Sequence, residues 1–187
     1  MRAEPLPRGE GFEFVDNIVG GVIPSQFIPA VEKGVKQVLE NGAFAGFPIE
    51  DVRVVIYDGK HHSVDSKEVA SVTAGKKAFI DAISKAGPII LEPIADVEVV
   101  VPSVNMGDIA GELASRRGRI SDTDTHSSGF IQISCAVPVA EMSDFQSRLN
   151  AISGGEGAFT MEFGSYEPAP VEVQRRLSAE YNQPDDD

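Results

Sequence analysis

The first half of the chain alternates strand-like runs with apolar stripes of helical period. Residues 11–19, GFEFVDNIV, predict a strand that stops at Gly20 and Gly21, where glycine permits a tight turn. From Pro24 onward, apolar residues recur at three- and four-residue spacing and predict a helix that ends near Gly42. The members of this stripe are Phe27, Ile28, Val31, Val35, Val38 and Leu39. The order is strand, turn and helix.

A second strand and helix follow. Residues 52–59, VRVVIYDG, are rich in β-branched side chains and predict a strand. An amphipathic pattern then runs from Ser66 to a stop at Gly87-Pro88 and predicts a helix. Between the two lies a polar turn that contains His61 and His62, so this turn is expected at one end of a domain.

The second half predicts a separate domain. Residues 88–102 look like a strand in two parts that is broken at Pro93, because proline cannot donate to a β-ladder, and we place the domain boundary there. The elements that follow are a strand at 95–102, a helix at 106–116, strands at 119–126 and 128–137, a helix at 140–151 and a strand at 157–166. This βαββαβ order is that of a ferredoxin-like fold.

A last helix is predicted at about 170–181 and has no sheet of its own to cover, so we expect it to pack on another part of the molecule. The predicted fold class is therefore α+β with two domains. The expected bounds are 1–92 for the first domain, 93–167 for the second, and 168–187 for the helix with its acidic tail.

Composition restricts the classes of function. The chain carries 16 basic and 29 acidic side chains, so its net charge is −13 and no general basic surface attracts nucleic acid. Any RNA contact must therefore be local. Cys135 is the single cysteine, which excludes an internal disulfide, and its strand-like setting predicts a buried position. We expect a cytoplasmic protein that does not span a membrane, because no apolar run has the required length.

The adjacent histidines have several possible roles. No helical His-x-x-x-His pair or cysteine pair accompanies His61 and His62, so a metal site is disfavoured. A catalytic role is also disfavoured, since no nucleophile lies in a recognisable setting such as Gly-x-Ser-x-Gly. An exposed, solvated turn and a contact loop toward phosphate or a base remain open. The chain also has no phosphate-binding Gly-x-x-x-x-Gly-Lys-Ser/Thr loop, so we expect neither enzymatic activity nor a bound cofactor or metal.

One dense basic cluster interrupts the acidic chain. Arg116, Arg117 and Arg119 lie at the C-terminal end of the predicted helix at 106–116, where cations are favoured by the helix dipole. The guanidinium fork also suits phosphate oxygens, so a local phosphate contact is the alternative interpretation of this cluster.

Long stretches of the chain resemble one known family. The run from GFEFVDNIVGGVIPSQFIPAVEKG to VRVVIYDGKHHSVDS resembles domain IV of bacterial elongation factor G. The stretches LEPIADVEVVVP, GELASRRGRI, VPVAEM and FTMEF resemble its domain V. The resemblance covers about residues 11–175 in order. It implies an incomplete ribosomal-protein-S5-like βαβ domain followed by a ferredoxin-like domain, with the C-terminal helix packed against domain IV.

The resemblance also implies a function. In the family, domain IV enters the decoding site of the ribosome, and messenger and transfer RNA move by one codon after GTP hydrolysis in another domain. The tip histidine of the pattern Tyr-His-Asp-Val-Asp-Ser falls on His62, within His61-His62-Ser63. We therefore expect an RNA-facing tip made of these residues with Gly20 and Gly21. Arg116 and Arg117 are expected to contact rRNA of the large subunit or to pack between domains.

The chain departs from the family pattern in two respects. His61 and Ser63 replace an aromatic residue and an aspartate. The GTPase domain, with its GTP and Mg²⁺, and the first strands of domain IV are missing, so we expect a non-catalytic C-terminal fragment of a translocase. Its exposed sheet edge would favour a monomer with local disorder near residues 1–10 or a weak dimer. Fragments of a recycling paralogue or a ribosomal protection protein, and a free-standing ligand-binding regulatory module, are the alternatives.

Overall fold

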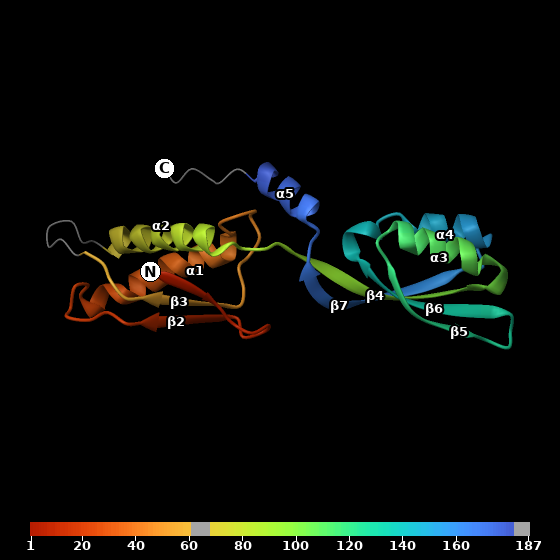
Figure 1. Ribbon diagram of the computed structural model, residues 1–187, viewed down its shortest axis with the longest axis horizontal. Coiled ribbons are helices and arrows are strands. Elements are labelled where there is room, and N and C mark those ends of the chain that lie inside the picture. The colour runs from red at the N-terminus through yellow and green to blue at the C-terminus, as the bar shows by residue number, and fades with distance from the viewer. Residues whose placement is uncertain (61–67, 182–187) are drawn as a thin grey trace. The chain divides into compact units, whose positions relative to one another are not determined.

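The computed structural model describes residues 1–60 and 68–181 (Figure 1). The chain divides into two compact units. Unit 1 comprises Met1–Ile90 together with the residues from Pro170 onward, and unit 2 comprises Leu91–Ala169. The first division lies two residues before the boundary predicted at Pro93. The last helix belongs to unit 1.

Unit 1 is a three-stranded sheet with helices on one face. Its elements are β1 (Arg2–Pro5), β2 (Phe12–Asp16), α1 (Ile28–Asn41), β3 (Val52–Ile56) and α2 (Glu68–Ala86). The strand order is β1-β3-β2, in which β3 pairs antiparallel with β1 and parallel with β2. Because β2 and β3 are parallel and joined through α1, both strands end at the same side of the unit.

The first ten residues correct one prediction. We expected local disorder near residues 1–10, whereas Arg2–Pro5 form a strand whose partner is β3. The loop between β1 and β2 is closed by Asp51, whose Oδ1 accepts the N–H groups of Gly9 (3.0 Å) and Gly11 (2.9 Å). A four-residue strand with two charged side chains has almost no periodic signal, so its pairing was not visible in the sequence.

The helices α1 and α2 approach each other through two glycines. A Cβ on Gly34 would lie 2.2 Å from the carbonyl oxygen of Val72, and a Cβ on Gly75 would lie 2.5 Å from that of Val31. Backbone therefore packs directly on backbone where the helices cross. Beneath them, apolar side chains of both helices and of β3 form the core: Val35, Val38, Leu39, Val52, Val54, Phe79 and Ile83.

The C-terminal helix α5 (Val171–Glu180) belongs to unit 1 and is tied to it at both ends. The side-chain Oε1 of Gln174 accepts the N–H of Ile90 at 3.1 Å. The ring of Tyr181 lies so close to Gly46 that a Cβ there would be 2.9 Å from ring atom Cε2. The loop at 42–50 therefore depends on glycine at this position.

Unit 2 has the predicted ferredoxin-like order. Its elements are β4 (Leu91–Pro102), α3 (Met106–Ser115), β5 (Arg119–Thr125), β6 (Phe130–Pro138), α4 (Phe145–Ser153) and β7 (Ala158–Pro168). The antiparallel sheet has the order β5-β6-β4-β7, and α3 and α4 cover one face (Figure 1). Helix α4 begins later than predicted, because a 3-10 turn occupies Val139–Glu141. The α+β class with two domains is confirmed.

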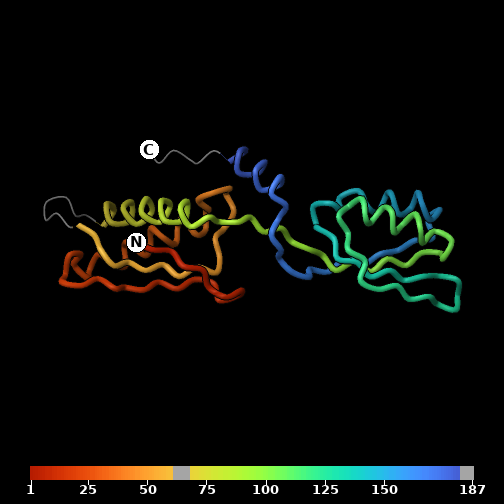
Figure 2. The backbone as a smooth tube through the Cα atoms, viewed as in Figure 1, coloured from red at the N-terminus to blue at the C-terminus, as the bar shows by residue number. Residues whose placement is uncertain are grey.

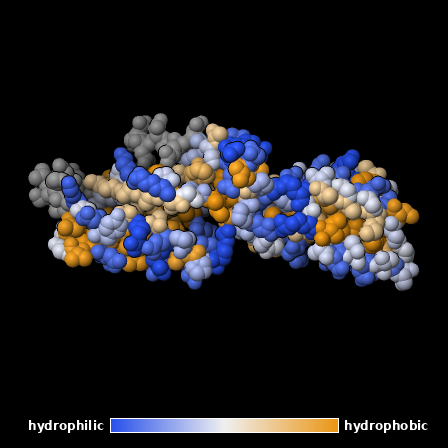
Figure 3. Space-filling model, in the orientation of Figure 1, coloured by the Kyte–Doolittle hydropathy of each residue, from blue (hydrophilic) through white to orange (hydrophobic). Residues whose placement is uncertain are grey.

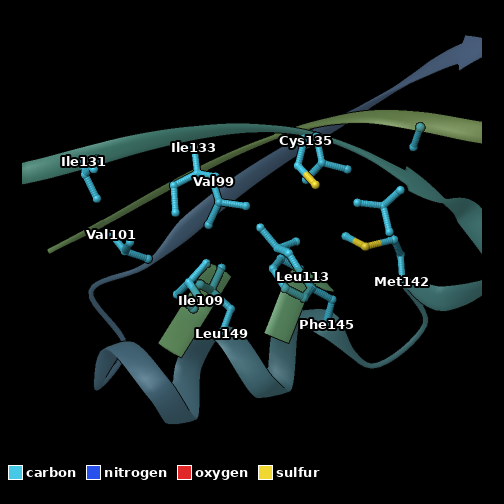
Figure 4. Close-up of a cluster of buried hydrophobic side chains, with 13 residues drawn as sticks. Val99, Val101, Ile109, Leu113, Ile131, Ile133, Cys135, Met142, Phe145 and Leu149 are labelled. Atoms are coloured by element: carbon cyan, nitrogen blue, oxygen red, sulfur yellow. The ribbon is translucent and has the colours of Figure 1, made fainter. Parts of the chain in front are cut away.

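The core of unit 2 lies between the sheet and its two helices. Valines of β4 and isoleucines of β6 face Ile109, Leu113, Phe145 and Leu149 of the helices (Figure 4). Cys135 lies in this core at 3% exposure, as its strand setting predicted, and burial raises the pKa of its thiol. From Ala95 to Pro102 in β4, and from Phe130 to Val137 in β6, every second side chain is buried in the core.

The break predicted at Pro93 is wrong, since β4 is one continuous strand from Leu91 to Pro102. Pro93 pairs with Tyr166 of β7, but β6 joins the sheet only from Ile94 onward. One side of β4 is therefore free of a ladder at Pro93, which is where a strand tolerates proline. The register shift between Ile94 and Ala95 adjusts the pairing to β7 directly after it.

The helix crossing gives a test of the fold. We expect Gly34→Ala to lower the free energy of unfolding of unit 1 by about 2 kcal/mol or more, because the new methyl group must push two backbones apart. Urea unfolding followed by circular dichroism measures the change. In the control Gly111→Ala, on an open position of α3, alanine instead raises stability by about 0.5–1 kcal/mol. Equal behaviour of the two variants would contradict the close approach.

Candidate functional site

Two loops meet at one end of unit 1, beyond the carboxyl ends of β2 and β3 (Figure 2). We call residues 17–24 the glycine loop and residues 57–60 the strand-end loop, and the two together the tip. The predicted residues His61, His62 and Ser63 follow the strand-end loop but lie outside the described residues. Gly20 and Gly21 were predicted to belong to the same tip, although they are distant in sequence, and they lie in the glycine loop.

The glycine loop is held at both ends and open in the middle. Ile18 and Ile23 pack on a small apolar cluster formed by Ile28, Val31 and Ile56. Between these anchors Gly20 and Gly21 have φ values of 73° and 69°, a region that side chains disfavour, and no atom lies within 4 Å of either Cβ position. Their backbone is therefore exposed and has no side chain to keep a ligand away.

Carboxylates at the two strand ends shape the turns. The Oδ1 of Asp16 accepts the N–H of Ile18 at 3.0 Å, and the Oδ1 of Asp58 accepts the N–H of Gly59 at 2.8 Å. Short acidic side chains commonly form such turns after a strand. The N–H of Asn17 also donates to the carbonyl oxygen of Ile56 at 2.8 Å, which joins the glycine loop to the end of β3.

The tip exposes several apolar side chains, although the protein as a whole is acidic. The side chain of Val19 is 81% exposed, and those of Val22 and Tyr57 are about half exposed. Figure 3 shows apolar surface at this end of unit 1, at the left of the view. The glycine loop contains no lysine, arginine or carboxylate. Such a surface suits contacts through shape, stacking and backbone groups better than contacts through charge.

The basic cluster is much less exposed than the tip. Arg116 is 9% exposed and lies in an ion-pair network inside unit 2. Its Nε and Nη2 donate to Glu112 Oε1 at 2.9 and 2.7 Å, and its Nη1 donates to Asp144 Oδ1 at 2.6 Å and to the carbonyl oxygen of Glu141. The guanidinium also lies 5.5 Å from the ring centroid of Phe145. Arg116 therefore serves the fold of unit 2, and its engaged donors disfavour the predicted rRNA contact.

Arg117 ends helix α3 in an unusual conformation. Its φ is 62°, and the N–H groups of Arg117 and Gly118 donate back to the carbonyl oxygens of Ala114 and Leu113. This is a Schellman ending, in which glycine usually takes the left-handed position. An L-residue there costs about 1 kcal/mol. From this position Arg117 forms a bidentate ion pair with Glu92.

The remaining arginine of the cluster is paired as well. Arg119 makes two hydrogen bonds to Glu167, at 2.9 and 2.6 Å. All three guanidinium groups thus have carboxylate partners in unit 2. The Glu112–Arg116 pair is visible in the sequence as an i,i+4 spacing, but Glu92, Asp144 and Glu167 are at least 25 residues from their arginines. The rRNA contact stays a prediction for Arg117, whose side chain is 35% exposed.

No metal cluster or membrane helix occurs within the residues that the structure describes. Groups of three or more histidine, cysteine or carboxylate side chains placed to hold a metal ion are absent from 1–60 and 68–181. Over the same ranges, none of the helices combines the length and the apolar character that crossing a bilayer requires.

Comparison with known sequences identifies both units. The family model described as "Elongation factor G, domain IV" matches residues 1–87, and that described as "Elongation factor G C-terminus" matches residues 89–177. The two modules place the chain among the translation elongation factors. It belongs to the elongation factor G family, as that family's domain IV followed by its C-terminal domain.

Individual relatives agree with this assignment. An elongation factor G-like protein of Thermotoga maritima is 47% identical over 180 residues, and elongation factor G of Aquifex pyrophilus is 46% identical over 180 residues. Both alignments cover 96% of this chain and 26% of the relative, so the chain spans about a quarter of their length. A crystal structure of a Thermus thermophilus protein superposes with a TM-score of 0.77 at 34% identity, over 95% of this chain and 26% of that one.

The ion-pair network predicts how the stability of unit 2 depends on pH. Hydrogen bonds from Arg148 and Arg116 lower the pKa of Glu112 below its usual value of 4.5. Because the folded-state pKa is the lower one, this stabilisation is complete above the unfolded value and is lost as the pH falls through the folded one. We expect the protection factors of amides in β4 and β6, which are exchange rates corrected for the intrinsic effect of pH, to fall below about pH 4.5.

The variant Glu112→Gln tests how much of the acid dependence comes from the carboxyl group of Glu112. At pH 7 the substitution should lower the stability of unit 2 by about 2 kcal/mol, the scale of hydrogen bonds to a charged group. It should also flatten the dependence on acid. Glu98→Gln, on an exposed position of β4, is the matched control. An unchanged acid dependence in Glu112→Gln would show that other carboxyl groups carry the effect.

Proposed function

We propose that this chain is the RNA-facing C-terminal part of a ribosomal translocase, and that its tip enters the decoding site while messenger and transfer RNA move by one codon. Unit 2 would contact the large ribosomal subunit. The supporting observation is the glycine loop of the tip, which has no charged side chain and an exposed backbone with Gly20 and Gly21 at its centre, in a chain of this family. Its natural partner would be the ribosome of the cytoplasm.

The chemistry of the tip fits a contact with structured RNA. Two glycines with open surroundings let the backbone come close to a sugar-phosphate edge. The exposed Tyr57 and the imidazole of His62 are side chains that stack on bases or donate to phosphate and hydroxyl groups. The net charge of −13 disfavours binding to RNA in general. These local contacts would therefore act once the whole factor is docked, where the effective concentration is high.

We further propose that the chain itself performs no catalysis and binds no cofactor. GTP hydrolysis, with its GTP and Mg²⁺, would belong to a GTPase domain acting together with these modules. The role of the chain in that cycle would be mechanical and positional, since a tip that occupies the decoding site prevents the RNAs from moving back.

A chimeric factor tests the proposed function. In elongation factor G of Aquifex pyrophilus, the matching quarter is replaced by this chain, and single-turnover movement of messenger RNA and GTP hydrolysis are measured on ribosomes. We expect the chimera to translocate. His62→Ala should slow movement roughly tenfold with hydrolysis nearly unchanged, since one stack or hydrogen bond to RNA is worth about 1–3 kcal/mol.

The matched control is His126→Ala, which changes the histidine next to the β5–β6 turn of unit 2 and should alter neither rate. A folded chimera that hydrolyses GTP but leaves the messenger in place would contradict the proposed function. Equal losses of movement and hydrolysis in His62→Ala would contradict the role of the tip.

A further inference from the structure

The two loops of the tip touch at a point where there is no room for a side chain on Gly59. A Cβ on Gly59, in the strand-end loop, would lie 2.4 Å from Cδ1 and 2.9 Å from Cγ1 of Ile23, in the glycine loop. Gly59 is not among the residues with positive φ, so its backbone conformation does not itself require glycine. Glycine is needed at position 59 for space, because the end of the Ile23 side chain occupies the place of a Cβ and would have to move if one were added.

Ile23 connects this contact to the interior of unit 1. It packs on the apolar cluster of Ile28, Val31 and Ile56, and Ile56 is the last residue of β3. The side chain is thus wedged between the start of α1, the end of β3 and the backbone of Gly59. Its position fixes how far the C-terminal end of the glycine loop lies from the chain that leaves β3.

The chain neighbours of the contact are exposed among the described residues: Val22 precedes Ile23, and Asp58 and Lys60 flank Gly59. The glycines at the crossing of α1 and α2 also stand where a Cβ would clash, but they join two helices in the core of unit 1. The contact of Gly59 instead joins two loops outside the sheet and helices. Its effect would therefore fall on the relative position of the two loops.

We propose that Ile23 and Gly59 form a positioning contact that holds the two loops of the tip at a fixed spacing, so that they meet RNA as one rigid surface. Neither side chain is required to touch RNA. The functional consequence rests on the proposed function of the tip, whereas the contact itself is a property of this chain and is tested without ribosomes.

The structural test uses this chain. In Gly59→Ala, the new methyl group should displace Ile23 and accelerate amide hydrogen exchange of Asn17, which donates to Ile56, by about tenfold or more. Amides of α1 and α2 should keep their exchange rates. The milder variant Ile23→Val removes the methyl group nearest Gly59 without any clash, and should give a smaller change of the same kind. Gly111→Ala, on the open face of α3, should leave the tip unchanged.

A double variant tests whether Ile23 and Gly59 act through the same contact. Ile23→Ala removes both atoms that would meet the new methyl group, so Gly59→Ala should add much less to exchange in this background than in the native chain. Additive effects, or tip amides that do not respond to Gly59→Ala, would overturn the contact.

The functional test places the same variants in the chimeric factor. Gly59→Ala should slow movement of messenger RNA about tenfold with GTP hydrolysis unchanged, and the loss should be smaller when Ile23→Ala is already present. Native movement in a Gly59→Ala chimera whose tip amides do respond would overturn the positioning role. A chimera that fails without any substitution contradicts the proposed function, and leaves the structural test of the contact standing.

Discussion

The close crossing of α1 and α2 is the constraint on which the rest of unit 1 depends. Gly34 and Gly75 remove the side chains that would separate the two helices, so both helices lie on one narrow sheet of three strands. The parallel pairing of β2 and β3 then brings two loops, 40 residues apart in sequence, to the same end. The tip is thus a consequence of helix packing in the core, and its own residues only complete it.

Unit 2 contains three arginines within a stretch of four residues, although the chain as a whole is acidic. Each guanidinium is matched with carboxylates from other elements, and the ion pairs tie α3, β4, α4 and β7 together. Arg117 pairs with Glu92 from a left-handed backbone conformation. A basic run in the sequence is therefore not equivalent to a basic surface. Its charge is largely neutralised before any partner arrives.

The elements that the sequence predicted are those with a strong local period, and they were found with modest errors at the ends. Strand β1 and the continuity of β4 were missed, because each depends on a distant partner, β3 in one case and the late start of β6 in the other. For the candidate site, resemblance to a family predicted Gly20 and Gly21 together with His62, although they are about 40 residues apart. The resemblance did not show that Ile23 and Gly59 touch. A contact between one side chain and the backbone of a distant glycine leaves no pattern in a single sequence.

A glycine loop without charged side chains, on a protein of net charge −13, also has a physical consequence for how the proposed RNA contact would operate. Long-range attraction to phosphate cannot guide such a loop, and without guidance most of its selectivity must come from fit at short range. Fit at short range requires that the two loops keep a fixed spacing. The proposed contact between Ile23 and Gly59 would supply that rigidity where the tip would meet RNA.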